Sequence, residues 1–305
     1  MKAAPFAWQR PASLNEALGA LAPGQASAIG GGQSLGPMLN LRLARPAALI
    51  ELRRLPELRA SGVDQGVLRL GAAVTHAEIE DGLVPDTTHG MLPWVARGIA
   101  YRAIRNRGTI GGSLCHADPA ADWVNSLMVL GAKVELASTA GRRQVPVEDF
   151  MRGAYATDLQ PGEVLAAVEL PAFGPGMRWG WNKICAKVGE FADAIGAVVV
   201  DPALGHCRLL VGAVEARPVL LPEPQALLRA VSEAAGAPAA PQAPAAQGGS
   251  GSATARAPDA PAAVELLAEA VGRAFPAHDA VFVHQHAVAL ARAIAQFNAR
   301  GARQP

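Results

Sequence analysis

Two glycine-rich segments carry the residue types with which this chain could do chemistry. Residues 30–35 read GGGQSL, and residues 108–114 read GTIGGSL. Glycines let a backbone approach a ligand closely, and free N–H groups at the start of a helix attract phosphate. Each segment is therefore a candidate phosphate site, or else a tight turn in which glycine only permits the bend. The first segment matches neither a P-loop nor the spacing of the dinucleotide fingerprint.

Acidic and small residues follow directly after the second segment. Residues 116–122 read HADPAAD, so Asp118 and Asp122 could accept hydrogen bonds from ribose hydroxyls or from a base. Two glycine segments on different parts of the fold could then bind the two ends of a large dinucleotide. The alternative is that both aspartates cap the helix that follows, since Asp before Pro often starts one.

No group of side chains in the sequence suggests acid–base or nucleophilic catalysis. The Gly-x-Ser-x-Gly elbow of hydrolases is absent, and we expect neither a catalytic side chain nor a metal site. His284 and His286 are spaced like a chelating pair, but without a third ligand in view we expect them to be solvated. The three cysteines are too few for an iron–sulfur cluster, and we expect ordinary buried thiols. These features favour a chain that holds a redox cofactor.

Alternating helix and strand signals surround the first glycine segment. Short apolar stretches at residues 26–29 and 48–52 predict strands, and residues 35–43 predict a helix between them. Strand–helix–strand order is typical of a parallel sheet. We therefore predict a small α/β unit over residues 1–55.

The rest of the chain predicts two further parts. Residues 56–173 indicate an α+β region, with strands at 67–74, 132–137 and 164–170 and one helix at 92–104. Residues 174–305 indicate an antiparallel meander of three strands (178–184, 194–200, 207–214), followed by helices at 224–235, 262–274 and 284–299. Residues 236–261 contain no apolar side chain larger than alanine and predict a flexible insertion.

Three stretches, in this order, resemble motifs of one family. Residues 29–46 begin IGGGQSL and end NLRLARP, residues 107–122 contain RGTIGGS and HADPAAD, and residues 183–192 read KICAKVGEFA. They are similar to the signatures of the FAD-binding (medium) subunits of molybdenum hydroxylases, the xanthine dehydrogenase and carbon monoxide dehydrogenase type. The resemblance covers the chain from residue 28 to about residue 200.

The resemblance implies a fold and a set of cofactor contacts. The fold is α+β: a two-part FAD-binding domain of the vanillyl-alcohol-oxidase (PCMH) type, and a C-terminal domain with a three-stranded antiparallel sheet and a helical bundle. The pyrophosphate would be wrapped by Gly30, Gly31, Gly32, Gln33, Ser34 and Leu35. A second FAD loop would be lined by Thr109, Ile110, Gly111, Gly112, Ser113 and His116.

Four more residues receive roles from the same resemblance. Asp122 would hydrogen-bond to the cofactor, and Leu165 would pack near it. Lys183 would approach the flavin end, and Phe191 would cover the isoalloxazine ring. Taken singly, each of these side chains could equally be structural, so only the surrounding motifs favour the cofactor roles.

Some positions depart from the family pattern. Ser113 stands where Asn is commoner, Ala186 replaces an Arg, and Glu190 replaces an Asp. The C-terminal helices lack the usual Tyr-Arg-Arg cluster. The departures leave open how the third part of the chain meets its partners.

The family's function implies a division of labour between subunits. FAD would lie on this chain, a molybdenum–pterin cofactor on a large partner, and [2Fe–2S] clusters on a small partner, in a dimer of heterotrimers. The chain would pass electrons from the clusters to an external acceptor. The alternatives are a stand-alone flavin-dependent oxidoreductase and a non-catalytic nucleotide-binding module.

The bulk composition excludes some other classes. Half of the 305 residues are hydrophobic, 17% are charged, and the net charge is +1, as in a folded protein without affinity for nucleic acid. No apolar stretch is long enough to span a membrane. The first residues lack the apolar core of a secretory signal, so we expect a cytoplasmic location.

Overall fold

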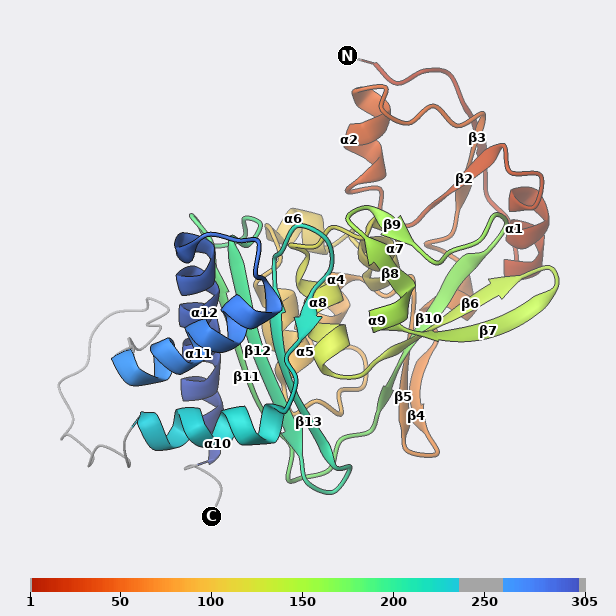
Figure 1. Cartoon of the computed structure of the whole chain (residues 1–305). Coiled ribbons are helices and arrows are strands. Elements are labelled where there is room, and N and C mark those ends of the chain that lie inside the picture. The colour runs from red at the N-terminus through yellow and green to blue at the C-terminus, as the bar shows by residue number, and fades with distance from the viewer. Residues whose placement is uncertain (1, 236–259, 302–305) are drawn as a thin grey trace, which may run out of the picture.

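The computed structural model describes residues 2–235 and 260–301, and most of the predicted insertion lies outside these ranges. Its larger sheets have three, five and four strands and follow one another along the chain (Figure 1). Each of the three lies within one of the predicted domains, whose bounds stay a prediction. No helix in the described ranges is long and apolar enough to cross a membrane.

The first sheet is parallel, as the order of its elements predicts. Strand β3 (Ala48–Glu51) lies between β1 (Ala7–Gln9) and β2 (Ala26–Ile29), and both neighbours run parallel to it. Helix α1 (Leu14–Leu21) connects β1 to β2, and α2 (Leu35–Asn40) connects β2 to β3. Strand β1 was not predicted, because its three residues are exposed and show no alternation.

The middle sheet is antiparallel, with the strand order β4-β5-β10-β6-β7. Its strands are β4 (Ser61–Asp64), β5 (Val67–Gly71), β6 (Lys133–Ser138), β7 (Gly141–Pro146) and β10 (Val164–Pro171). Between and around them lie α3 (Pro56–Arg59), α4 (His76–Glu80), α7 (Ile110–His116), α8 (Asp122–Val129), α9 (Val147–Phe150), and the hairpin of β8 (Met151–Gly153) and β9 (Ala156–Thr157). The three strands predicted for this region are confirmed.

The single helix predicted at residues 92–104 is wrong. Two helices occur there, α5 (Met91–Arg97) and α6 (Arg102–Arg105), because Gly98 ends the first and Ala100 adopts a φ of +42°. The freed carbonyl groups find side-chain donors instead: the Arg105 guanidinium donates to Ala100 and the Lys183 ammonium to Gly98. These interactions explain why the break is stable.

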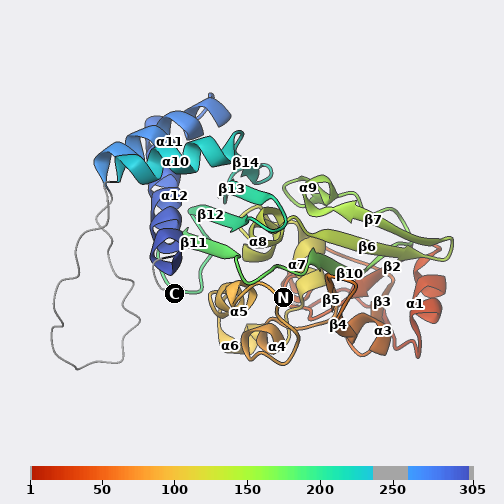
Figure 2. The same cartoon turned by 90° about the horizontal axis from the view of Figure 1, so that it is seen from below.

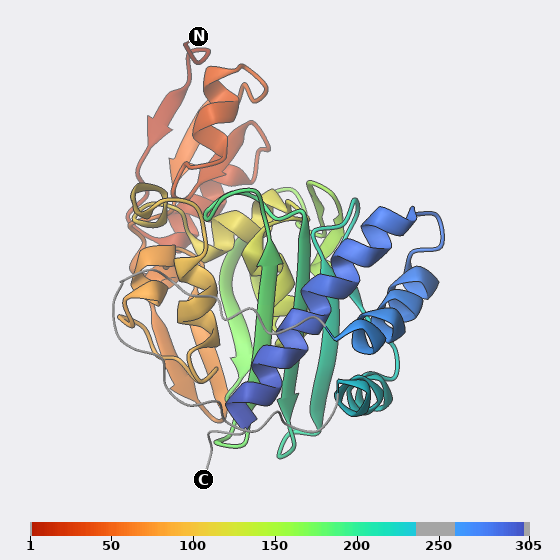
Figure 3. The ribbon, with the colours of Figure 1, turned by 90° about the vertical axis from the view of Figure 1, so that its left-hand side faces the viewer.

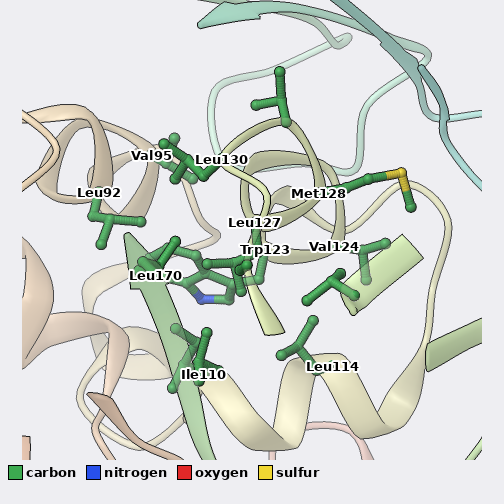
Figure 4. Close-up of a cluster of buried hydrophobic side chains, with 14 of the residues drawn as sticks. Leu92, Val95, Ile110, Leu114, Trp123, Val124, Leu127, Met128, Leu130 and Leu170 are labelled. Carbon is green, nitrogen blue, oxygen red and sulfur yellow. The ribbon is translucent and has the colours of Figure 1, made fainter. Parts of the chain in front are cut away.

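The largest core cluster joins the middle sheet to α8. The Trp123 side chain is fully buried and lies among Ile110, Leu127 and Leu170 (Figure 4). Burial of a large aromatic side chain is among the strongest single contributions to a core. The core thereby fixes α8, and with it Asp122 in the first turn of that helix.

The third sheet carries the predicted antiparallel meander. Strands β11 (Arg178–Ile184), β12 (Ala194–Asp201) and β13 (His206–Gly212) pair in sequence, and a two-residue strand, β14 (Val219–Leu220), adds a fourth that was not predicted. The sheet is thus four-stranded rather than three-stranded. A strand of two residues shows no periodicity, so β14 could not be predicted from the apolar pattern.

Helix α12 (Ala280–Gly301) packs diagonally across one face of this sheet (Figure 3), and α8 contacts the other face (Figure 2). Two glycines permit the close approach of α12. A Cβ atom on Gly180 would lie 1.8 Å from the Ala293 carbonyl oxygen, and one on Gly196 would lie 2.4 Å from Cα of Leu290. Covered on both faces, β12 is apolar along nearly its whole length.

Helices α10 (Pro224–Ala234) and α11 (Pro261–Ala274) complete the helical part, which confirms the predicted C-terminal helices. His286, which we expected to be solvated, is buried instead, and its Nδ1 lies 2.8 Å from the Phe282 carbonyl oxygen. The expectation of buried thiols was also wrong for Cys115, which is exposed and free.

Candidate functional site

The first glycine segment joins β2 to α2 and touches the second segment directly. A Cβ atom on Gly31 would lie 1.9 Å from the Arg107 carbonyl oxygen, and one on Gly30 would lie 2.9 Å from Oγ1 of Thr109. Gly32 has a φ of +72°, which residues with a Cβ atom rarely adopt. The glycines are therefore needed, in the first place, for the contact between the two segments.

The second glycine segment forms the start of α7. Thr109 caps this helix, since its Oγ1 accepts a hydrogen bond from the Gly112 N–H group at 3.1 Å. Ile110 is buried in the core, and a Cβ atom on Gly111 would lie 2.5 Å from Cβ of Ala72. Ile110 therefore anchors the segment in the core, and Gly111 packs against Ala72.

A cavity of about 900 Å³ lies between the two segments. This volume is within the range of roughly 300–1,000 Å³ that is usual for cofactor sites. Most of the site residues predicted from the sequence line its wall: Gly30, Gly31, Gly32, Gln33, Ser34, Leu35, Thr109, Gly112, Ser113, His116, Asp122 and Phe191. The fold thus brings together residues that are up to 161 positions apart.

An adjoining cavity of about 390 Å³ shares Gly30, Thr109 and Gly112 with the first. Gly111 and Leu165 line this second space and not the first. Leu165 belongs to β10 and is almost fully buried, so it offers an apolar surface at the inner end of the site. The two cavities therefore adjoin along the residues that they share.

A buried ion pair lies in the wall of the larger cavity. The Lys183 ammonium donates to Oδ2 of Asp122 and to the Gly98 carbonyl oxygen, both at 3.0 Å. Burial raises the pKa of the Asp122 carboxyl group, and the Lys183 charge only partly offsets this. Lys183 itself does not line the cavity; it orients the aspartate that does.

The second oxygen of Asp122 has no partner. Its Oδ1 atom is buried and accepts no hydrogen bond from any residue that the structure describes. Unsatisfied buried acceptors are rare in folded proteins, and one in a cavity wall indicates a donor that arrives with a ligand. Hydroxyl and ring N–H groups of a flavin dinucleotide are such donors, so this residue set fits that cofactor.

Two exposed aromatic side chains stand at the cavity wall. Phe191 is 67% exposed and Tyr101 is 66% exposed, although large aromatic side chains are usually buried. Phe191 was predicted, but Tyr101 was missed. It belongs to the segment between α5 and α6, which also contributes Ile99 and Ile104 to the wall. Gly98 was the available signal, because glycine commonly ends a helix.

Glycine segments that wall a cavity of this size in an α+β fold fit a dinucleotide-binding domain. Comparison with known proteins then gives the family: residues 4–173 match the model described as FAD binding domain in molybdopterin dehydrogenase. Since this match covers more than half of the 305 residues, the chain belongs to the family of FAD-binding subunits of molybdenum-containing dehydrogenases. The match includes the first two sequence motifs, and the resemblance to this family is thereby confirmed.

Individual relatives agree with this family. The nicotine 6-hydroxylase medium subunit of Paenarthrobacter nicotinovorans is 35% identical over 216 residues, which is 70% of this chain and 76% of that relative. The carbon monoxide dehydrogenase medium chain of Hydrogenophaga pseudoflava is 34% identical over 209 residues, 67% of this chain and 73% of the relative. The chain is thus similar to medium subunits of multi-subunit oxidoreductases.

Solved structures confirm the fold class. Quinoline 2-oxidoreductase from Pseudomonas putida 86 matches with a TM-score of 0.76 and 33% identity, over 100% of both chains. Carbon monoxide dehydrogenase from Hydrogenophaga pseudoflava matches with a TM-score of 0.79 and 28% identity, over 98% of this chain and 99% of the other. The likeness therefore includes the C-terminal part as well as the FAD-binding domain.

Proposed function

We propose that this chain holds FAD in the cavity between its glycine segments and passes electrons from [2Fe–2S] clusters of a partner subunit to an external acceptor. The observation that carries the proposal is the unpaired, buried Oδ1 of Asp122 in the wall of that cavity. When bound, FAD supplies the ability to take up and release electrons. All further contributions come from side chains and backbone of this chain.

The proposed roles follow from where each residue lies. Residues 30–35 line the cavity and their backbone N–H groups would bind the pyrophosphate, while Thr109, Gly112, Ser113 and His116 form the wall of the second segment. Asp122 would accept a hydrogen bond at Oδ1, and Lys183 holds its carboxylate in place. Leu165 would pack near the cofactor from the adjoining cavity, and Phe191 would cover the flavin ring.

The proposed partners follow from the relatives. Their names place them as medium subunits or chains, and one related structure is described as lacking the Mo-pyranopterin moiety of the molybdenum cofactor. We therefore assign a molybdenum–pterin cofactor to a large partner and the [2Fe–2S] clusters to a small one. The proposed assembly is a dimer of heterotrimers in the cytoplasm.

Co-purification tests this function directly. The tagged chain should bring down two partner chains, and the complex should contain flavin, iron and molybdenum; acid precipitation should release the flavin, since we propose non-covalent binding. Flavin-dependent activity of the chain alone would favour a stand-alone oxidoreductase. Nucleotide binding without flavin or partners would favour a non-catalytic module, and either result would overturn the proposal.

A further inference from the structure

A buried histidine lies in the cavity wall with one ring nitrogen already engaged. His76 is the first residue of α4 and is only 5% exposed, yet it lines the larger cavity. Its Nδ1 atom lies 2.9 Å from Nε1 of Trp123. Trp123 is fixed in the main core cluster (Figure 4), so the indole holds the imidazole from the core side of the cavity wall.

The contact with Trp123 determines which nitrogen of His76 carries the proton. An indole N–H group can only donate, so Nδ1 of His76 must accept and must be unprotonated. Burial, with a smaller contribution from the Arg105 charge, lowers the pKa of His76 to about 4. The ring is therefore neutral near neutral pH, and its single proton is on Nε2.

The Nε2–H group lies beside the second glycine segment. A Cβ atom on Gly108 would lie only 2.7 Å from Nε2, so glycine is needed there to leave space for the ring. The backbone N–H of His76 donates to the Gly108 carbonyl oxygen at 3.0 Å, which holds the two segments in register. No residue of the described ranges accepts a hydrogen bond from Nε2.

We propose that the Nε2–H group of His76 donates a hydrogen bond to an acceptor atom of the bound dinucleotide, and that Trp123 is the positioning residue that fixes the required tautomer. This inference rests on the proposed FAD site. A neutral donor complements the unpaired Asp122 acceptor, so the wall offers one fixed donor and one fixed acceptor to the same ligand.

Two substitutions separate the two nitrogens of the ring. In His76→Asn the amide oxygen can still accept from Trp123, as Nδ1 does, but no donor reaches the cavity. In His76→Gln the longer side chain can present an N–H group near the position of Nε2. We expect FAD to bind the full-length Asn variant roughly tenfold more weakly than wild type, and the Gln variant within about threefold.

Titration with FAD, FMN and riboflavin locates the acceptor. A loss that persists with riboflavin places it on the isoalloxazine ring or the ribityl chain, and a loss confined to FAD and FMN places it on a phosphate. Equal affinities of the Asn variant and wild type for FAD would overturn the inference while leaving the FAD site intact. A wild-type chain that binds no flavin would overturn both proposals.

Nitrogen-15 NMR of the wild-type chain gives a second readout that requires no variant to fold. We expect the His76 resonances of a neutral ring protonated at Nε2 in the flavin-free chain. On FAD binding, the Nε2–H proton should move downfield and become protected from exchange. A ring protonated at Nδ1, or an Nε2–H signal that FAD does not change, would contradict the proposal.

Discussion

At the scale of single residues, glycines close together in the sequence differ in whether a side chain could replace them. Gly31 has no space for a Cβ atom, because the Arg107 backbone occupies it, whereas Gly36 in α2 has nothing within 4 Å. A backbone obstacle cannot move aside as a side chain can. Glycine is therefore required at position 31 for a steric reason: it lets the two segments that wall the cavity lie close together.

This difference makes a matched pair of substitutions. Gly31→Ala should push the segments apart and weaken FAD binding by roughly tenfold or more, about 1.4 kcal/mol. Gly36→Ala should leave FAD binding unchanged and stabilise α2 slightly, since alanine favours helix over glycine. Flavin content per chain, measured after gel filtration, checks both, and full occupancy in Gly31→Ala would reduce the first segment to an ordinary turn.

The Asp122–Lys183 pair gives a second prediction at this scale. Lys183→Met removes the positive partner and leaves a buried carboxyl group, which should cost roughly 3–5 kcal/mol of unfolding free energy unless Asp122 takes up a proton. Lys187→Met is the control: its side chain is 79% exposed and its contact with Glu190 is long, so the loss should stay below about 0.5 kcal/mol. Urea unfolding at pH 7 distinguishes the two, and equal stabilities would contradict a structural role for the pair.

The candidate site could be predicted in part from the sequence, for physical reasons that differ between residues. Glycines beside strands are visible as motifs, so both segments were found. Gly98 marks the end of α5 but does not show that Tyr101 lines a cavity, and His76 has no local signal of its own, so both were missed. Their place depends on contacts with residues distant in the chain, such as Trp123, which only the folded structure brings near.

At the scale of elements, apolar patterns predicted the strands better than the helix ends. Strands β10 and β12 occur where predicted, because runs of buried apolar residues mark them directly. The break between α5 and α6 was missed although Gly98 marks it, because one of the two donors that stabilise the break, Lys183, is distant in the chain. Tertiary donors can thus override a local preference for continuing a helix.

The contact between α12 and its sheet can be tested in the same way. Gly196→Ala would put a Cβ atom 2.4 Å from the backbone of Leu290, so the helix must shift. We expect a loss of about 1–3 kcal/mol in unfolding free energy, as for other overpacked cores. Gly62→Ala on β4 meets nothing within 4 Å and should change stability by less than about 0.5 kcal/mol. Thermal unfolding of both variants checks this, and an unshifted Tm for Gly196→Ala would mean that α12 is not held against β12.

At the scale of the whole molecule, the cavity wall draws on three parts of the chain. The first glycine segment follows β2 of the parallel sheet, and the second adjoins the middle sheet. Residues 189–191 follow β11 of the third sheet. Gly189 packs against the middle part of the chain, since a Cβ atom added to it would lie 2.9 Å from the Ala100 carbonyl oxygen. A cofactor bound there contacts all three parts, so its binding should stabilise their arrangement.

The order of electron flow provides the last prediction, which concerns the complete complex. If this chain only relays electrons, loss of FAD should block reduction of the acceptor but leave reduction of the clusters, which lie before it, unaffected.

The complex with Gly31→Ala is mixed anaerobically with substrate, and the absorbance of the clusters is followed; the Gly36→Ala complex is the control. Iron, molybdenum and flavin contents first establish that both complexes are intact and that only the Gly31→Ala complex has lost its FAD. Bleached clusters without acceptor turnover would support the order substrate, molybdenum, iron–sulfur, FAD. Clusters that stay oxidised in the intact flavin-free complex, while the control bleaches, would place the flavin at the substrate end and overturn the proposed relay.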